Sequence, residues 1–194
     1  MLIKDQFEVS QPIESVWKFF GDIPQVASCL PGADLTDVIG EDHYGGTVLI
    51  RLGPVKLEFG GEAKNSQRNE ATKTITVDAS GADKKGRGQA ALGLNARLAP
   101  IANGTKVDIS MDLQLSGAAA QYGRGLIADV TAVLLGQFAD AMQGRLDAIA
   151  KGIDPAKVGA PRSASGLSIG LRAAGMALTR VFKRFFAPYQ PTSN

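Results

Sequence analysis

The stretch GAAAQYGRGLIADVTAVLLGQFADAMQGRLDAIAK, residues 117–151, decides the fold. Its apolar residues recur with the 3.6-residue period of an α-helix, and a helix of this length is long enough to cross a whole β-sheet. One face of the expected helix is apolar and would meet the sheet: Ile127, Val130, Leu134, Phe138 and Ala141. The opposite face is expected to meet solvent and carries Asp129, Asp140 and Asp147.

The chain before this stretch alternates between apolar and polar residues, a period of two that is typical of β-strands. A strand is expected over residues 2–10, followed by a short helix that Pro12 opens as its first residue. The segment DIPQVASCLPG predicts a second short helix that ends at Pro31 and Gly32. From Asp34 onward, alternating strands separated by turn signals such as GADKKG and ANGT continue to residue 115.

This order of elements predicts an α+β fold of the helix-grip type. A curved antiparallel sheet of six to seven strands would wrap around the long helix near the C-terminal end of the domain. We expect one domain over residues 1–152, a flexible linker rich in Pro, Gly and Ser over residues 153–165, and a separate amphipathic helix over residues 166–189.

The space between the sheet and the long helix is expected to be either a solid core or an apolar cavity. Small residues favour a cavity: the helix begins in SGAAAQYGRG, and the facing strands contribute Gly61, Ala63, Ala79, Ala90 and Ala96. A cavity of this kind binds an apolar ligand. The predicted ligand-contacting residues are Trp17, Phe20, Val48, Ile50, Leu57, Phe59, Leu92, Leu94, Met111, Leu113, Ile127, Val130 and Leu134.

Catalytic chemistry finds little support in the sequence, because every position expected to point inward is apolar. His43 is the only histidine and is expected in an exposed loop, and Cys29 is the only cysteine and is expected in the core. Neither can assemble a metal site alone, and the chain lacks a GxxxxGK[ST] phosphate-binding loop. We therefore predict a protein without enzymatic activity or a metal.

The segment GLSIGLRAAGMALTRVFKRFFAPY, residues 166–189, predicts an amphipathic helix with a purely cationic polar face. Such a helix suits the surface of a membrane rich in anionic lipid; docking on its own domain or in a groove of a protein partner are the alternatives. The predicted membrane-binding residues are Leu171, Arg172, Leu178, Arg180, Phe182, Lys183, Arg184, Phe185 and Phe186.

The net charge of +2 conceals an acidic body and a basic tail. All 19 acidic residues lie within residues 1–154, whereas the rest of the chain carries bases only. Nucleic acid is not the expected partner, because the body lacks a basic stripe interleaved with aromatic residues. The N-terminal sequence MLIKDQFEVSQP has acids where a signal peptide has an apolar run, so we expect a peripheral protein at the cytoplasmic face of the cell membrane.

Three segments are distinctive: VWKFFGDIPQVASCLPGADL (16–35), YGGTVLIRLGPVKLEFGGEA (44–63) and QYGRGLIADVTAVLLGQFADAM (121–142). Together they resemble the CoxG family of carbon monoxide dehydrogenase proteins, within the START-like or SRPBCC superfamily. The most specific features are the spacing from Trp17 to CLPG at residues 29–32 and the GPVK turn at residues 53–56. The resemblance covers roughly residues 1–150 and implies a START-like helix-grip fold.

The resemblance also implies an accessory protein, without enzymatic activity, that helps molybdenum carbon monoxide dehydrogenase reach the membrane. We expect its apolar pocket to hold a quinone such as menaquinone, so that CO oxidation is coupled to the respiratory chain. The expected partners are the dehydrogenase, the quinone and anionic lipids. Two alternatives stay open: an assembly or anchoring factor with no ligand, and a general lipid carrier.

Overall fold

The computed structural model describes residues 1–52, 55–155 and 158. The predicted tail over residues 166–189, with all its membrane-binding residues, and most of the predicted linker lie outside the described residues.

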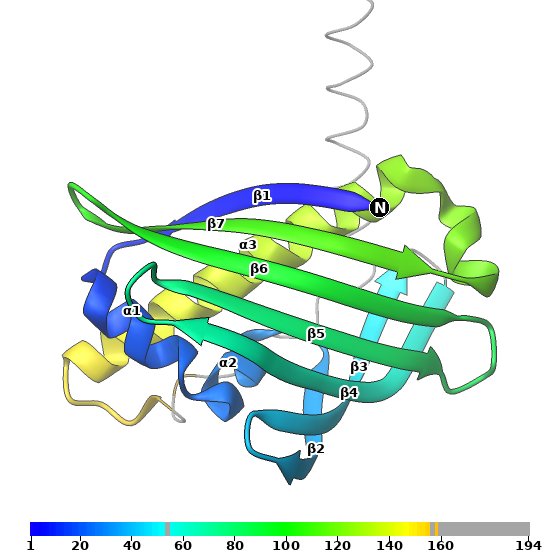
Figure 1. Ribbon diagram of the computed structural model, residues 1–194, viewed down its shortest axis with the longest axis horizontal. Helices are drawn as coiled ribbons and strands as arrows, with labels where there is room; N and C mark the ends of the chain where they lie inside the picture. The colour runs from blue at the N-terminus through cyan, green and yellow to red at the C-terminus, as the bar shows by residue number, and fades with distance from the viewer. Residues whose placement is uncertain (53–54, 156–157, 159–194) are drawn as a thin grey trace, which may run out of the picture.

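The described chain folds into one curved sheet with helices on one side (Figure 1). Its seven antiparallel strands follow the order β1-β7-β6-β5-β4-β3-β2, so β1 and β2 form the two edges. The strands are β1 (Leu2–Val9), β2 (Ala33–Gly40), β3 (His43–Leu52), β4 (Val55–Asn69), β5 (Thr74–Asp83), β6 (Gln89–Ile101) and β7 (Gly104–Leu115). The helices are α1 (Ile13–Phe20), α2 (Ile23–Cys29), a short 3-10 helix η1 (Gly117–Tyr122) and α3 (Gly123–Ala150).

The helices lie where the sequence pattern indicated. In Figure 1, α3 crosses behind the sheet, and α1 and α2 lie at one end of it. This arrangement confirms the predicted helix-grip fold and the upper estimate of seven strands.

The starts of the two short helices follow from local chemistry. Pro12 has an extended backbone, with φ −57° and ψ 145°, so it caps α1 rather than forming its first residue as predicted. Asp22 caps α2 by accepting a hydrogen bond from the backbone N–H of Gln25, at 3.2 Å. That helix ends where Leu30 adopts an extended conformation just before Pro31.

The long helix differs from its prediction in two respects. Residues Gly117–Tyr122 form the 3-10 helix η1, and α3 begins only at Gly123. Gly123 has φ +75°, a left-handed conformation that interrupts a right-handed helix and that glycine adopts without steric cost. In addition, Asp129 is buried rather than exposed, so its assignment to the solvent face was wrong, whereas Asp140 is exposed as expected.

The main core lies where β1, β5, β6 and β7 meet α1 and the C-terminal half of α3. Phe138 of α3 packs edge-on against Phe7 of β1, with ring centroids 5.8 Å apart. One turn later, Met142 is completely buried. Since burial of a large apolar side chain contributes about 1.5–3 kcal/mol, these contacts hold α3 to this end of the sheet.

Within the described residues, one helical stretch, Gly117–Ala150, is long and apolar enough to span a membrane by length and composition. Phe138, Met142 and Leu146 of this stretch are buried in the main core, as in the central helix of a compact domain.

Candidate functional site

The inner face of the sheet carries a belt of small residues. Residues paired across neighbouring antiparallel strands share one face of a sheet, and two adjacent rows can be followed in this way from β7 to β3. One row is Leu113, Leu92, Ala79, Ala63 and Tyr44, and the other is Leu115, Ala90, Gly81, Gly61 and Gly46. Both rows face inward, because Leu92 packs against the main core and Leu115 packs against a second apolar cluster.

We call Gly46, Gly61, Ala63, Ala79, Gly81 and Ala90 the small-residue belt. None of its members is fully buried. In the described residues, α3 approaches β1, α1 and α2 more closely than it approaches the strands that carry the belt. The belt therefore lies where the helix stands away from the sheet and where side chains add little bulk.

Gly61 has a structural reason of its own to be small. A Cβ at this position would overlap the carbonyl oxygen of Ser80 on the neighbouring strand, so β4 and β5 can approach this closely only with glycine here. Ala63, Ala79 and Ala90 already carry a Cβ and are not under this constraint. These three alanines are consequently the better markers of space beside the belt.

The predicted ligand-contacting residues fall into three groups around the belt. In the first, Trp17, Phe20 and Met111 are buried in the main core, and Leu92 and Leu94 pack against it. The second group is built on Leu57, Phe59 and Val130, which are buried in two smaller clusters that share Ile50; Leu134 packs against Val130. The third comprises Val48, Leu113 and Ile127, which lie outside these clusters.

The position of Val48 is informative because it pairs with buried Phe59 yet remains 39% exposed. Leu113 and Ile127 are only partly buried. Inward-facing apolar side chains that keep access to solvent are suited to contact a ligand. The structure thus brings the belt together with Leu92, Leu113 and Val48.

Trp17 contacts the residues that connect β4 to β5. Its indole N–H donates to the carboxylate of Glu70, while the guanidinium carbon of Arg68 lies 4.5 Å from the ring centroid. Arg68 also donates to the backbone oxygen of Trp17, at 2.9 Å. These contacts attach α1 to the turn between β4 and β5.

The inner face is not wholly apolar, although the sequence pattern predicts that it is. Asp83, the register partner of Phe59, is buried, and its two carboxylate oxygens accept hydrogen bonds from Nε and Nη2 of Arg87, each at 2.7 Å. Arg87 holds the pKa of this carboxyl well below its ordinary value. Because Arg87 also donates to the backbone oxygen of Lys56, the pair joins the β5–β6 turn to β4 and has a structural role.

The two side chains best suited to catalysis, those of Cys29 and His43, are respectively buried and in contact with a carboxylate. Cys29 is completely buried, and burial raises the pKa of its thiol to about 11, so the reactive thiolate is scarce at neutral pH. His43 is the first residue of β3, and its Nε2 lies 2.9 Å from the Glu62 carboxylate. Among the described residues, no three His, Cys, Asp or Glu side chains gather as a metal site requires.

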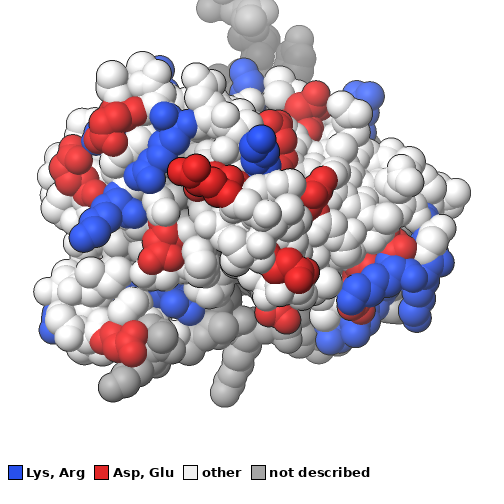
Figure 2. Space-filling view, turned by 60° about the horizontal axis from the view of Figure 1, so that its bottom comes forward, with Lys and Arg blue, Asp and Glu red and all other residues white. Residues whose placement is uncertain are grey.

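Surface charge is mixed on the face that Figure 2 shows, where basic and acidic side chains are interspersed. A continuous basic stripe, such as a nucleic-acid-binding protein presents, is not seen among the described residues on this face.

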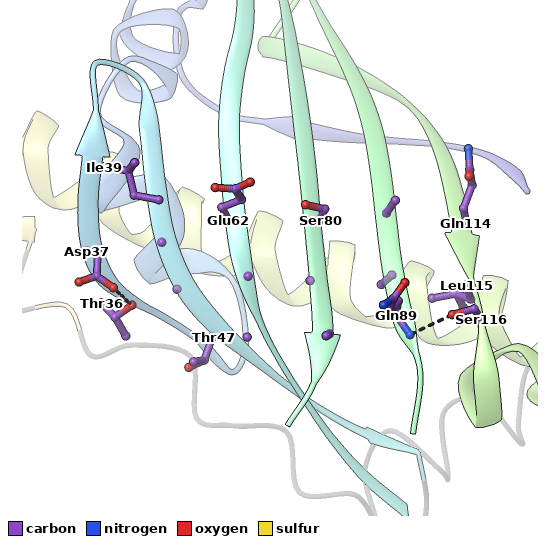
Figure 3. Close-up of a pocket in the computed structure, with 18 residues that line it drawn as sticks. Thr36, Asp37, Ile39, Thr47, Glu62, Ser80, Gln89, Gln114, Leu115 and Ser116 are labelled. Atoms are coloured by element: carbon purple, nitrogen blue, oxygen red, sulfur yellow. Dashed lines mark hydrogen bonds between the residues drawn. The ribbon is translucent and has the colours of Figure 1, made fainter. Parts of the chain in front are cut away.

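The structure also contains a groove of about 900 Å³ that the sequence pattern did not predict. It lies on the outer face of the sheet, opposite α3 (Figure 3). The polar residues that line it are Thr36, Asp37, Thr47, Glu62, Ser80, Gln89, Gln114 and Ser116. A sequence signal was present in the glycine pairs at residues 45–46 and 60–61, which lie side by side in the paired strands β3 and β4.

Comparison with known proteins assigns the family. The sequence model of the carbon monoxide dehydrogenase protein CoxG matches residues 6–147. No match was found among curated protein sequences.

Solved structures share the fold at low sequence identity. A conserved protein from Geobacillus kaustophilus has a TM-score of 0.68 at 20% identity, covering 76% of this chain and 95% of its own. A START superfamily protein from Mycobacterium smegmatis has a TM-score of 0.53 at 13% identity, covering 76% and 98%. The Zhui aromatase/cyclase from Streptomyces sp. R1128 has a TM-score of 0.55 at 11% identity, covering 77% and 95%.

The family model associates the chain with carbon monoxide dehydrogenase, and the solved structures show its fold. The chain belongs to the CoxG family of carbon monoxide dehydrogenase proteins and has a START-like helix-grip fold.

Proposed function

We propose that this chain is a non-enzymatic, membrane-tethered carrier that holds a quinone, most simply menaquinone, for molybdenum carbon monoxide dehydrogenase. The dehydrogenase oxidises CO outside the bilayer, whereas the quinone that receives the electrons is dissolved in the bilayer. A protein with an apolar site and a membrane anchor would join the two.

The observation that carries this proposal is the small-residue belt flanked by half-exposed apolar side chains. An isoprenoid tail is a flexible hydrocarbon, and Leu92, Leu113 and Val48 offer it apolar contacts from three different strands. Each methylene group removed from water contributes about 0.8 kcal/mol, so several isoprene units suffice for stable binding. The charged groups of the inner face do not oppose this, since Asp83 is already satisfied by Arg87.

A polar contact for the quinone ring is available at the end of the belt. Tyr44 continues the inner row beyond Ala63 and is partly buried. A phenolic O–H can donate to a quinone carbonyl, and no other side chain in this row carries a hydroxyl. We assign Tyr44 to the head group and the belt to the tail.

In this proposal, residues 166–189 attach the chain to the membrane. Their basic residues would meet anionic headgroups at about 1 kcal/mol each, and their aromatic residues would enter the interface. The cytoplasmic leaflet is the surface we propose, because it carries the anionic lipid that a purely cationic helix face requires.

Electron delivery to vesicles tests the proposal. Purified molybdenum carbon monoxide dehydrogenase is given CO and anionic vesicles that contain menaquinone, with the full chain, with a chain that ends at Lys157, or alone. We expect the full chain to accelerate quinone reduction and the shortened chain to lose most of that effect. Equal rates in all three reactions would contradict the carrier function and favour an assembly or anchoring factor.

A further inference from the structure

The groove on the outer face crosses most of the sheet. Its walls and floor come from β2, β3, β4, β5, β6 and β7 in turn. Its small lining residues are Gly45, Gly60, Ala82 and Ala91, together with the belt residues Gly46, Gly61, Gly81 and Ala90, so little side-chain bulk stands above the backbone there. In Figure 3, Thr36, Asp37 and Ile39 lie at one end of the groove and Gln89, Gln114 and Ser116 at the other.

The edge strand β2 is shaped to form one wall of this groove. Its pairing with β3 is interrupted twice, and the residues left without a partner are Thr36 and Ile39. Bulges of this kind re-aim side chains, and both bulged residues line the groove. Asp37 and Ile39 lean over Gly45, where an added Cβ would lie 3.2 Å and 3.6 Å from their nearest side-chain atoms.

The dimensions of the groove fit an extended polypeptide. Neighbouring strands lie about 4.8 Å apart, so a path from β2 to β7 follows the sheet for about 24 Å. An extended chain rises about 3.3 Å per residue, and this length accommodates about seven residues. The amide groups of Gln89 and Gln114 both donate and accept hydrogen bonds, as recognition of a peptide backbone requires.

The charge of the groove selects a basic occupant. Asp37 and Glu62 line it, and the flanking outer rows add Asp34 and Asp78. Asp112, in the same rows, is paired with the N-terminal ammonium group of Met1 at 3.0 Å. In these rows of the described sheet, Lys64 is the one lysine or arginine. Lys84 also reaches over the lining residue Gly60, where it is paired with Glu58 at 2.7 Å. Asp37 accepts a hydrogen bond from Thr36 and Glu62 pairs with His43, and within the described residues neither is paired to a lysine or arginine.

We propose that this outer groove is a docking site for an extended basic segment of a protein partner. The identification of the partner as the dehydrogenase rests on the proposed function. The evidence for a peptide-binding groove is independent of that function, because it comes from the groove's own dimensions and charge. The same acids would repel a nucleic acid or an anionic membrane surface. The groove shares Gly46, Gly61, Gly81 and Ala90 with the small-residue belt, whereas Ala63, Ala79, Leu92, Leu113 and Val48 do not line it.

The test is a binding measurement between the full chain and purified molybdenum carbon monoxide dehydrogenase, at low and at raised salt. Reversing both acids in an Asp37→Lys, Glu62→Lys variant is expected to weaken binding more than about tenfold, with most of the loss vanishing at raised salt. An Ala91→Trp variant, which fills the floor, is expected to weaken binding at both salt concentrations.

Two matched variants serve as controls. Asp140→Lys reverses an exposed acid on α3, and Asn95→Trp places the same side chain at an exposed site elsewhere on β6. Both should bind as the unmodified chain does. Groove variants that bind normally would overturn the proposal, as would a wild-type chain that binds only itself or anionic vesicles. Quinone content, measured on each sample, reports separately on the proposed function.

Discussion

Replacing one alanine of the small-residue belt by a larger residue tests whether the belt lines a binding site or a packed core. Ala79 and Ala96 both lie on the inner face of the sheet, on the neighbouring strands β5 and β6. Ala79 belongs to the belt and is only partly buried, whereas Ala96 is 2% exposed between Ile75 and Ile109 in the main core. The substitutions Ala79→Leu and Ala96→Leu therefore make the same chemical change in two different environments.

The two substitutions are expected to have different effects on the free energy of unfolding. In the packed core, extra methylenes cost about 1–3 kcal/mol. For a chain of this size each kcal/mol shifts the melting temperature by about 2–4 °C, so Ala96→Leu should lower it by about 2–12 °C. Beside the belt, three added carbons that find apolar space contribute up to about 2.4 kcal/mol. Ala79→Leu should thus leave the melting temperature of ligand-free protein unchanged or raised.

The assay combines thermal melting of solvent-extracted, refolded protein with the quinone content of protein purified directly from cells. We expect Ala79→Leu to melt normally and to carry much less quinone, because the leucine occupies the ligand's space. Ala96→Leu should melt early and, where folded, keep its quinone. If Ala79→Leu loses as much stability as Ala96→Leu, the belt is close-packed and the reasoning is refuted.

Five further outcomes are expected. A chain ending at Lys157 should stay folded and leave the membrane fraction, and serine replacement of three tail aromatics should weaken vesicle binding in flotation assays: Phe182, Phe185 and Phe186. Tyr44→Phe should keep the melting temperature and reduce retained quinone, measured by extraction. Because the folded-state pKa of Asp83 is lowered, its stabilisation is complete above about pH 4 and is lost as pH falls further, so Asp83→Asn should flatten the acid limb of a melting-temperature profile. Cys29 should resist a thiol reagent in the folded protein at pH 8 and react once denatured; prompt reaction of the folded protein would contradict its burial.

The fold was predictable because its determinants are periodic and local. The sequence alone contains these patterns: alternation along the strands, Pro and Gly at the turns, and the long helical period before Ala150. The break at Gly123 was missed because a glycine within a helical pattern does not reveal its φ angle. Asp129 was misplaced because burial on a helix depends on what packs against each face, which a helical projection does not include.

The candidate site was predictable only in part. Period two placed Leu92, Leu113 and Val48 on the inner face, but it could not distinguish the belt from the packed core beside Ala96. The ion pair of Asp83 and Arg87 joins the β5–β6 turn to strand β4 and depends on tertiary structure. The sequence pattern did not predict the outer groove. The groove depends on the shape of the strands and on two bulges at Thr36 and Ile39, and these features produce no periodic pattern in the sequence.

Mass spectrometry of an organic-solvent extract tests the central claim most directly. The full chain is purified from the membrane fraction of its own cells, extracted, and compared with an equal amount of the Ala79→Leu variant. We predict a quinone in near-stoichiometric amount from the wild-type chain and a much smaller amount from the variant. An extract that contains phospholipid alone would indicate a general lipid carrier, and an extract without any lipid would contradict the carrier account and leave an anchoring role.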